Sequence, residues 1–374
     1  MQIDKYDFAK KKKRRLNMKI ILEKATKQLA QNLPFVLYKK PSEANVIGFF
    51  QKNDSLYLVK DFTEKGFVFT SFDGNQNIII PENQSEISFV VYDKKKTDYL
   101  EEESDLTNEW DGTHFKKLVA KGIKAIENKE FKKVVLSRKE TVDLVHFDLI
   151  QAFEKLVQWY PSTFVYCFFH PKVGIWLGAT PEQLVKANGT SFRTMALAGT
   201  QKDKGFSEVF WEEKEKKEQQ FVTDYIVETL NEPAAEITVS KPYSLKAGNI
   251  WHINTDISGV FNAGFRLQQV IRLLHPTPAV CGLPKDKAKA FILENENYDR
   301  TFYTGFLGEL NCNFNTDSIS SNLFVNLRCM EICDSQANLY VGCGITKDSV
   351  PEKEWQESVN KSVTMKRIVD LRFY

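Results

Sequence analysis

The stretch His275-Pro-Thr-Pro-Ala-Val-Cys-Gly-Leu-Pro-Lys285 holds three prolines and one glycine in eleven residues, and apolar runs flank it. Proline fixes φ and lacks a backbone N–H, whereas glycine permits positive φ. This composition predicts a rigid, irregular loop between two packed elements. Because such a loop inside a domain more often forms the wall of a site than a linker, we expect a functional site beside it.

Helical spacing of apolar residues predicts helices on both sides of this loop and at several other places. The expected helices lie at about 115–128, 148–159, 208–230, 266–274, 285–296 and 351–371. A further helix is expected to run from the basic N-terminal segment through Met18 to Leu22.

Short apolar runs bounded by turn residues are typical of strands. They occur at 35–38, 46–50, 56–59, 67–70, 78–80, 87–91, 131–138, 164–169, 174–179, 183–187, 191–198, 236–240, 250–260, 303–314, 319–332 and 338–345. Runs of strands interrupted by isolated helices, without regular βαβ spacing, predict an α+β fold with large antiparallel sheets. Since no internal repeat or low-complexity linker divides the chain, residues 1–374 are expected to form a single unit, with a strand-rich N-terminal part at 1–110.

Composition excludes several classes of protein. The 374 residues are 42% hydrophobic and 27% charged, and the formal net charge is only +2. This balance argues against nucleic acid or a membrane as the main partner, and no run approaches the ~18 apolar residues of a membrane helix. We therefore expect a cytoplasmic protein, a monomer, that acts on a small molecule.

Two features of the composition allow more than one interpretation. The basic run Lys10–Arg15 could be a nucleic-acid or lipid patch, or the solvated side of a helix, and the second is favoured because nothing downstream extends the patch. The six cysteines show no C-x-x-C pair, so free buried thiols in a reducing compartment are favoured over disulfides or zinc. They are Cys167, Cys281, Cys312, Cys329, Cys333 and Cys343.

Two predicted helices carry acids where apolar residues are expected. Glu218 precedes Phe221, Val222 and Tyr225 at helical spacing, and Glu354, Glu357 and Lys361 share one arc of the closing helix. Buried charge is expensive unless it is paired or bound to metal, so two carboxylates and a lysine would suit Mg²⁺ and an anionic ligand. The alternative is an ordinary surface ion pair between Glu357 and Lys361.

Four other positions are candidates on residue type alone. Glu182 ends the predicted turn Gly178–Glu182 and could be an ordinary turn residue. Alternatively, it could be a general acid if burial raised its pKa. His252 lies in a predicted strand, where a satisfied core histidine is the commoner outcome. Arg328 stands among apolar residues and therefore needs an anionic partner. The turn Gly342–Ile345 could offer backbone N–H groups to an oxyanion, which by itself is weak evidence.

Taken in order, ten segments resemble the chorismate-utilising enzymes, and most closely their isochorismate synthase branch. The segments are Lys133–Arg138, Gly178–Glu182, Leu197–Thr200, Glu213–Glu218, Trp251-His252 with Gly259, His275–Gly282, Tyr298–Arg300 with Tyr303–Gly305, Asn326–Arg328, Gly342–Ile345, and Pro351-x-x-Glu354-x-x-Glu357-x-x-x-Lys361. The resemblance covers about residues 113–371, whereas 1–110 match only in being rich in predicted strands.

The resemblance implies two large stacked antiparallel sheets flanked by helices. It also implies Mg²⁺-dependent conversion of chorismate to isochorismate, for menaquinone or siderophore biosynthesis. By matching motif positions, Lys133 would activate water as the base, and Glu182 would protonate the departing hydroxyl. Glu218 and Glu357 would hold Mg²⁺. A lysine base must be neutral and a glutamic acid must be protonated, and burial favours both forms.

The same resemblance implies a set of substrate-binding residues. Arg328, Lys361 and the Gly342–Gly344 backbone would bind a carboxylate, and His252 and Ala279 would line the ring. The full set is Ala198, Gly199, Thr200, His252, Ala279, Tyr303, Leu327, Arg328, Gly342, Gly344 and Lys361.

Individual positions favour one branch of the family. Members that use ammonia carry Gln at the position of Lys133, and aminodeoxychorismate synthase typically carries Lys at the position of Ala198, so this chain is expected to use water. Salicylate synthase, which shares the lysine and then eliminates pyruvate, is the alternative. A non-catalytic binding protein is a third hypothesis. The chain departs from the family at Gln219, where His is frequent, and at Cys343, where a small Ala is usual.

Overall fold

A computed structural model of the chain describes residues 18–92 and 112–369, apart from 204, 206–208, 249, 315 and 317. The basic run Lys10–Arg15 lies outside these ranges, as does the predicted end of the closing helix at 370–371. No helix in the described ranges is long and apolar enough to span a membrane.

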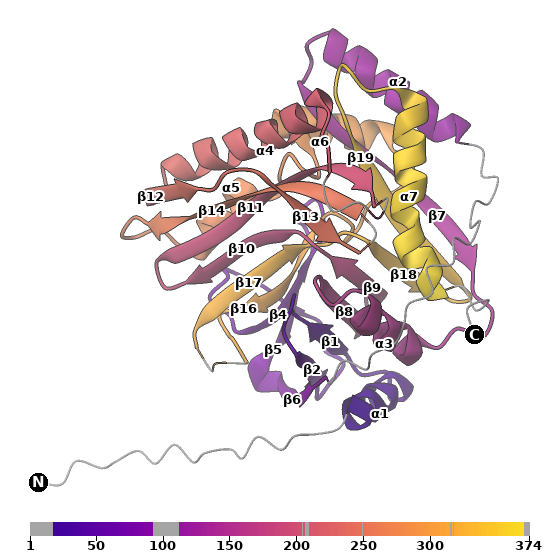
Figure 1. Cartoon of the computed structure of the whole chain (residues 1–374). Helices are drawn as coiled ribbons and strands as arrows, with labels where there is room; N and C mark the ends of the chain where they lie inside the picture. Colours follow the sequence, from indigo (N-terminus) through magenta and orange to yellow (C-terminus); the bar gives the residue numbers. More distant parts are fainter. Residues whose placement is uncertain are drawn as a thin grey trace, which may run out of the picture.

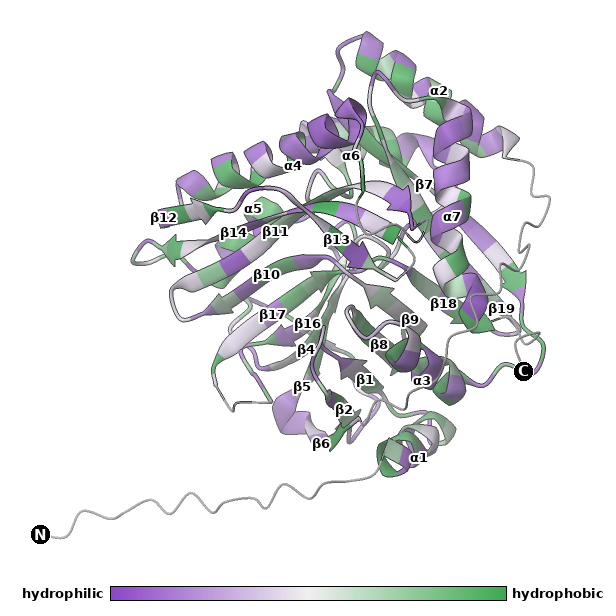
Figure 2. Cartoon of the chain, viewed as in Figure 1, coloured by the Kyte–Doolittle hydropathy of each residue, from purple (hydrophilic) through white to green (hydrophobic). Residues whose placement is uncertain are grey.

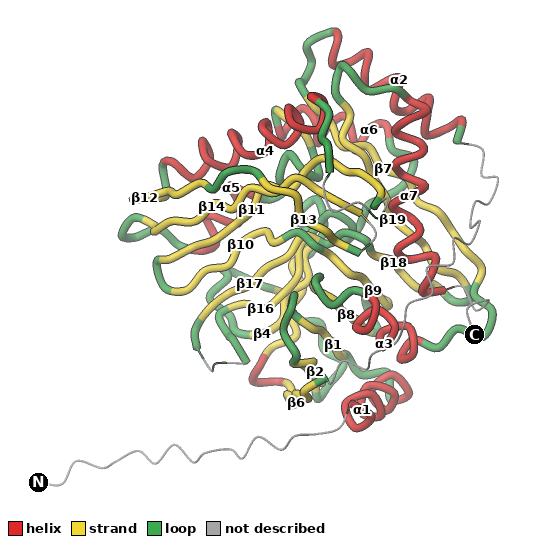
Figure 3. The backbone as a smooth tube through the Cα atoms, viewed as in Figure 1, coloured by secondary structure: helices red, strands yellow, loops and turns green. Residues whose placement is uncertain are grey.

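The strands form two large antiparallel sheets (Figures 1 and 3). The first sheet has nine strands in the order β15-β7-β19-β18-β9-β8-β1-β2-β6. Their bounds are Gly282–Leu283 (β15), Lys133–Asp143 (β7), Gln336–Ile345 (β19), Cys329–Cys333 (β18), Gly174–Thr180 (β9), Phe164–His170 (β8), Phe35–Lys39 (β1), Asn45–Gln51 (β2) and Ser85–Val91 (β6).

The second sheet has ten strands, nine of them in the order β12-β14-β11-β10-β17-β16-β4-β5-β3, with β13 also paired to β14. Their bounds are Ala234–Val239 (β12), Ile250–Phe261 (β14), Ser191–Lys202 (β11), Gln183–Asn188 (β10), Ser320–Val325 (β17), Phe306–Leu310 (β16), Gly66–Thr70 (β4), Asn77–Pro81 (β5), Tyr57–Leu58 (β3) and Tyr243–Ala247 (β13).

Aromatic side chains fill the space between the two sheets. Tyr38 and Phe164 of the first sheet pack against Phe67 of the second, with ring centroids 5.0 and 6.4 Å from it. Alternation along each strand sends the neighbouring side chains to the opposite face, so Phe35 and Leu37 join a separate core on the outer side of the first sheet. Figure 2 shows the resulting concentration of apolar residues along the strands.

Helices cover the outer faces of both sheets. In the first sheet, α1, α3 and α7 pack on one outer core, and α2 and α6 cover the end formed by β7 and β19. In the second sheet, α4 and α5 pack on the outer core. Their bounds are Met18–Ala30 (α1), Thr113–Glu127 (α2), Leu149–Trp159 (α3), Glu213–Asn231 (α4), Leu267–Leu274 (α5), Lys285–Asn295 (α6) and Pro351–Val369 (α7), with a short 3₁₀ turn at Glu82–Gln84.

The α+β architecture of two stacked antiparallel sheets with outer helices is therefore confirmed. Strands from the N-terminal part enter both sheets, since β1 pairs with β8 and β4 pairs with β16. The division of the chain into domains stays a prediction.

Several element predictions were wrong in detail. The expected strand 319–332 is two strands, β17 and β18, which belong to different sheets. The expected strand 303–314 is confined to Phe306–Leu310, and the long helix begins at Glu213 rather than near 208. Strands β13 and β15 were not anticipated. All six cysteines are free, as expected, but Cys333 is exposed rather than buried.

Candidate active site

A cavity with an empty volume of about 680 Å³, its open mouth included, is lined by residues of both sheets, the Pro-rich loop, α4 and α7. Fifteen site residues were predicted from the sequence, and fourteen of them line this cavity. They are Glu182, Ala198, Gly199, Thr200, Glu218, His252, Ala279, Tyr303, Leu327, Arg328, Gly342, Gly344, Glu357 and Lys361. The structure thus brings together residues from nine separated segments, while their individual roles stay predictions.

The fifteenth residue, Lys133, lies directly behind the cavity wall. Alternation along β7 turns its side chain to the same face as Val135, which lines the cavity, and the side chain is fully buried. Its Nζ lies 3.0 Å from Glu218 Oε1 and has no hydrogen bond of ordinary geometry within the described residues. The pairing holds Glu218 over β19, where a Cβ on Gly344 would lie 2.0 Å from the Glu218 carboxylate oxygen. Any side chain at 344 would therefore displace this carboxylate.

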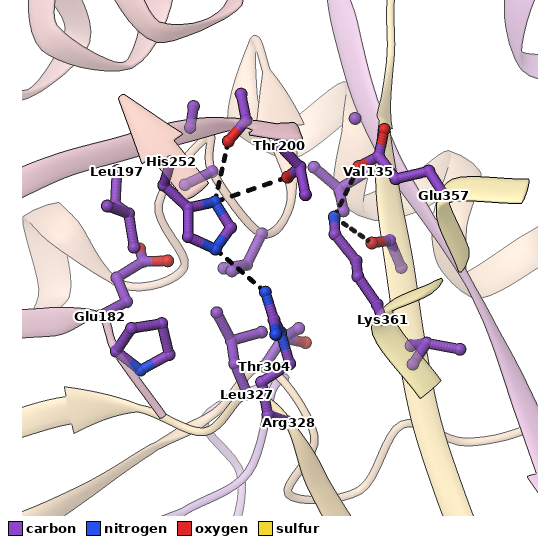
Figure 4. Close-up of a pocket in the computed structure, with 18 of the residues that line it drawn as sticks. Val135, Glu182, Leu197, Thr200, His252, Thr304, Leu327, Arg328, Glu357 and Lys361 are labelled. Atoms are coloured by element: carbon purple, nitrogen blue, oxygen red, sulfur yellow. Dashed lines mark hydrogen bonds and ion pairs between the residues drawn. The ribbon is translucent and has the colours of Figure 1, made fainter. Parts of the chain in front are cut away.

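Glu182 lies where the chain leaves the first sheet for the second, between β9 and β10. Its side chain points into the cavity on the side opposite Lys361 and Glu357 (Figure 4). Only 4% of the residue is exposed, and this burial raises the pKa of Glu182 to about 8, although Lys133 and Lys361 oppose the shift. The carboxyl group is therefore mainly protonated at neutral pH, which is the form a general acid needs.

Arg328 occupies the return crossing, between β17 and β18, with φ at +47°. One guanidinium N–H donates to His252 Nε2 at 3.0 Å, and the other ring nitrogen, Nδ1, lies 2.8 Å from the carbonyl oxygen of Gly199 (Figure 4). Burial, together with the charges of Arg328 and Lys361, lowers the pKa of His252 to about 3. His252 is therefore neutral, with its proton on Nδ1, and leaves the positive charge of Arg328 uncancelled.

Backbone hydrogen bonds hold the two crossings in register. The Val325 N–H donates to the Glu182 carbonyl at 2.9 Å, and the Ala179 N–H donates to the Arg328 carbonyl at 3.0 Å. The predicted acid and the predicted carboxylate-binding arginine are thus fixed relative to each other by the main chain.

A buried ion pair ties the Pro-rich loop to the strand that carries Lys133. Arg300 donates to the Glu296 carboxylate through two nitrogens at 2.6 and 2.7 Å. It also donates to the carbonyl of Val135 at 2.7 Å and to that of Val280 at 3.0 Å. In addition, Gly282 in β15 pairs with β7 beside Lys133. The stiff loop predicted from its prolines is therefore anchored to the site on two sides.

Comparison with known proteins agrees with this geometry. A family model described as chorismate binding enzyme matches residues 68–370. The chain belongs to the chorismate binding enzyme family. The match begins at residue 68, so it includes part of the N-terminal strands that the motifs left out.

Relatives within the chorismate binding enzymes include more than one activity. Isochorismate synthase EntC of Escherichia coli K12 is 30% identical over 271 residues, which are 69% of this chain and 68% of that protein. Anthranilate synthase component 1 of Lactococcus lactis is 29% identical over 259 residues, which are 66% of this chain and 55% of that protein. The crystal structure of a putative 2,3-dihydroxybenzoate-specific isochorismate synthase, DhbC, from Bacillus anthracis shares the fold, with a TM-score of 0.76, 23% identity, and coverage of 94% of this chain and 98% of that one.

Carboxylates from α4 and α7 converge at one end of the cavity of this chorismate binding enzyme. Burial favours the neutral form of Glu218, but the attraction of Lys133 and Lys214 outweighs it, so the pKa of Glu218 is lowered. Glu357 pairs with Lys361 at 2.7 Å, which in turn donates to the Gly342 carbonyl at 3.0 Å. The ion pair that sequence reasoning kept as an alternative does form, but it lines the cavity and is mostly buried.

This carboxylate cluster fits a hard divalent cation. Glu354, next to Glu357 on α7, is fully buried, and one of its carboxylate oxygens has no hydrogen-bond partner in the described part of the chain. The other oxygen pairs with Lys214, whose charge also acts on Glu218 and Glu357. Oxygen donors of this kind are the ligands that Mg²⁺ prefers. The sulfur of Cys343, a soft donor, lies within 4.8 Å of ligand atoms of Glu354 and Glu357.

Sequence reasoning missed several residues that line the cavity or support it. The cavity-lining residues are Val135, Pro181, Leu197, Val280, Thr304, Tyr340 and Val341. All are next to residues that were nominated, so strand alternation and adjacency were the available signal. Arg300 stands in the Tyr298–Arg300 segment of the resemblance, but its pairing with Glu296 gave no signal, because a buried salt bridge cannot be distinguished from a solvated i,i+4 pair by spacing.

Proposed function

We propose that the protein is a Mg²⁺-dependent isochorismate synthase that converts chorismate to isochorismate by adding water at C2 and releasing the C4 hydroxyl. The observation that carries the proposal is a buried, protonated carboxylic acid and a buried lysine at one cavity of a chorismate binding enzyme. The isochorismate formed would enter menaquinone or siderophore biosynthesis.

The reaction needs one proton acceptor and one proton donor. Lys133 would take a proton from the attacking water as the new C2–O bond forms. The ring double bonds shift, the C4–O bond breaks, and Glu182 would give its proton to the departing oxygen, which leaves as water. The two proton transfers balance, so the product is an isomer of the substrate.

The charges of the cavity suit a dicarboxylate. Arg328 and Lys361 contribute two buried cations, and His252 is neutral and so adds no positive charge but can donate or accept a hydrogen bond. Buried cations bind a carboxylate through charge-assisted hydrogen bonds, which are about twice as strong as neutral ones. These groups would bind one substrate carboxylate in place of the partners they have now.

The carboxylates at the other end would hold the metal. Glu218 and Glu357 would be the ligands, with Glu354 and its unpartnered oxygen beside them. When bound there, Mg²⁺ would neutralise these acids and attract the second substrate carboxylate, which the three glutamates would otherwise repel.

The buried lysine also favours water over ammonia as the nucleophile. By the family resemblance, members that use ammonia carry Gln at the position of Lys133. An uncharged amide cannot accept a proton from water at neutral pH, whereas a lysine can once it is neutral.

Product analysis tests the proposal. The purified protein is incubated with chorismate and MgCl₂, with and without an ammonium salt, and products are identified by liquid chromatography and mass spectrometry. We expect isochorismate under both conditions and no activity after chelation of the metal. Accumulation of salicylate and pyruvate would show a salicylate synthase, and anthranilate formed from ammonium would contradict the role of Lys133.

A matched pair of variants tests whether Glu357 belongs to the metal site. Glu357→Ala should abolish Mg²⁺ binding measured by calorimetry, whereas Glu352→Ala, on the exposed side of the same helix, should leave it unchanged. Equal Mg²⁺ affinity in the two variants would remove Glu357 from the metal site.

A further inference from the structure

A second large pocket lies outside the catalytic cavity. Its empty volume is about 1130 Å³, a figure that includes the open mouth. We call it the lysine pocket, because six lysines from four segments of the chain line it. They are Lys129, Lys132, Lys214, Lys217, Lys287 and Lys347.

The charge of the lysine pocket is strongly unbalanced. Glu130 and Asp348 are its only acidic lining residues, so six lysines and two acids leave a formal charge of +4. Five of the lysines are exposed, and their ammonium groups make no hydrogen bond or ion pair among the described residues; only Lys214 pairs, with Glu354. Like charges gathered in one concave site repel each other and attract anions.

The floor of the lysine pocket is apolar. Phe131 and Ile126 are buried, and Phe221 is half-buried against the same space. Thr346 also lines the pocket, is 7% exposed, and has a buried hydroxyl with no hydrogen-bond partner in the described part of the chain. An unpartnered buried hydroxyl is unfavourable, so a ligand that forms a hydrogen bond with it would be stabilised.

We propose that the lysine pocket binds a phosphorylated small molecule that carries a flat aromatic ring, the chemical class of the nucleotides. Lysine ammonium groups bind phosphate as point charges, and a triphosphate, with about four negative charges, would match the charge of the pocket. The ring would lie on the aromatic floor, and Thr346 would donate to a ligand oxygen. Carboxylates alone would leave most of the positive charge unbalanced.

A ligand bound in the lysine pocket would affect the catalytic cavity, because three residues of the pocket are close in the chain to residues of that cavity. Lys214 lies one helical turn before Glu218, and Lys132 precedes Lys133. Thr346 directly follows the Gly342–Ile345 segment of β19. This link to catalysis rests on the proposed function, whereas binding itself does not, so the two can fail separately.

Calorimetric titration tests binding in buffer that contains EDTA, so that no metal–nucleotide complex forms at the carboxylates. The probes are ATP, inorganic triphosphate and adenosine, and the protein is the full chain. We expect saturable one-to-one binding of ATP that weakens as salt rises, with each of the other two probes at least about 10-fold weaker, since each supplies half of the contacts. Absence of saturable ATP binding would overturn the proposal, and triphosphate binding as tight as ATP would refute the role of the floor.

Paired charge reversals locate the site. Lys129→Glu with Lys287→Glu should weaken ATP binding at least about 10-fold, because each lost ammonium–phosphate contact contributes more than 1 kcal/mol. The control is Lys60→Glu with Lys186→Glu, which changes net charge equally at exposed positions outside the pocket and should leave the affinity within about twofold. Equal losses in both double variants, or displacement of ATP by chorismate, would show that ATP does not occupy the lysine pocket.

Discussion

Replacing Glu182 by Gln should change how the stability of the protein depends on pH. The carboxyl group is 4% exposed and its pKa is about 8, against an ordinary value of 4.5. Between these two values the unfolded chain has already lost the proton that the folded chain keeps. Stability contributed by the protonated group is therefore complete below about pH 4.5 and is lost as pH rises through about 8.

The size of the effect follows from the shift. One pKa unit corresponds to about 1.4 kcal/mol, so a shift from 4.5 to about 8 lowers the free energy of unfolding by roughly 5 kcal/mol over that window. A glutamine has no proton to lose and removes this dependence. Glu182→Gln should thus resemble the wild type near pH 5 and be several kcal/mol more stable than it at pH 9.

Urea denaturation at pH 5, 7 and 9, without substrate or Mg²⁺, measures the difference. Glu127→Gln, on an exposed part of α2, is the control and should follow the wild type. The same Glu182 variant should lose about 10²–10⁴-fold in turnover of chorismate, and wild-type activity should fall above about pH 8. If the free energies of unfolding of the wild type and Glu182→Gln changed in parallel with pH, Glu182 would not be a protonated buried acid.

Three further variants test the rest of the site. Lys133→Ala should reduce the turnover of chorismate about 10²–10⁴-fold with an unchanged circular dichroism spectrum. The control Lys132→Ala, on the opposite face of the chain, should remain active. If the two variants had comparable activity, Lys133 would not be the base. Lys361→Met should raise KM more than it lowers kcat if the lysine binds a substrate carboxylate, and steady-state kinetics would contradict that role if only kcat changed. Glu296→Gln should lower the free energy of unfolding by about 3–5 kcal/mol, because it leaves the buried guanidinium of Arg300 unpaired. Urea denaturation measures this loss, and a loss below about 1 kcal/mol would show that the pair is not stabilising.

The sequence predicted the site residues better than their surroundings. Alternation in 133–138 already placed Lys133 on one face with Val135, and helical spacing already placed Glu218, Glu357 and Lys361 on inward-facing arcs. These are local signals, because a side chain's direction depends on its own strand or helix. Glu218, Glu357 and Lys361 do line the cavity, and Lys133 lies behind its wall, so the predicted directions are confirmed while the chemistry of these residues is left to experiment.

The pairing of those residues could not be predicted in the same way. That Lys133 lies 3.0 Å from Glu218 depends on how β7 and α4, separated by about eighty residues, pack together. The same holds for the breaks in predicted strands. Apolar patterning at 319–332 is nearly continuous, so nothing local marked Asn326–Arg328 as the place where the chain changes sheets.

Those breaks explain why the reactive groups meet where they do. The backbone of a residue within a sheet forms hydrogen bonds with the neighbouring strands, and its side chain points to one face of the sheet. Glu182 and Arg328 lie instead where a pair of antiparallel strands passes from one sheet to the other, so their side chains enter the gap that opens between the sheets. Because backbone hydrogen bonds join the two crossings, neither can shift without the other. The Pro-rich loop, held by Arg300 and β15, lines the same cavity through Ala279 and Val280, and its rigidity would keep that wall in place beside the proposed acid and the proposed base.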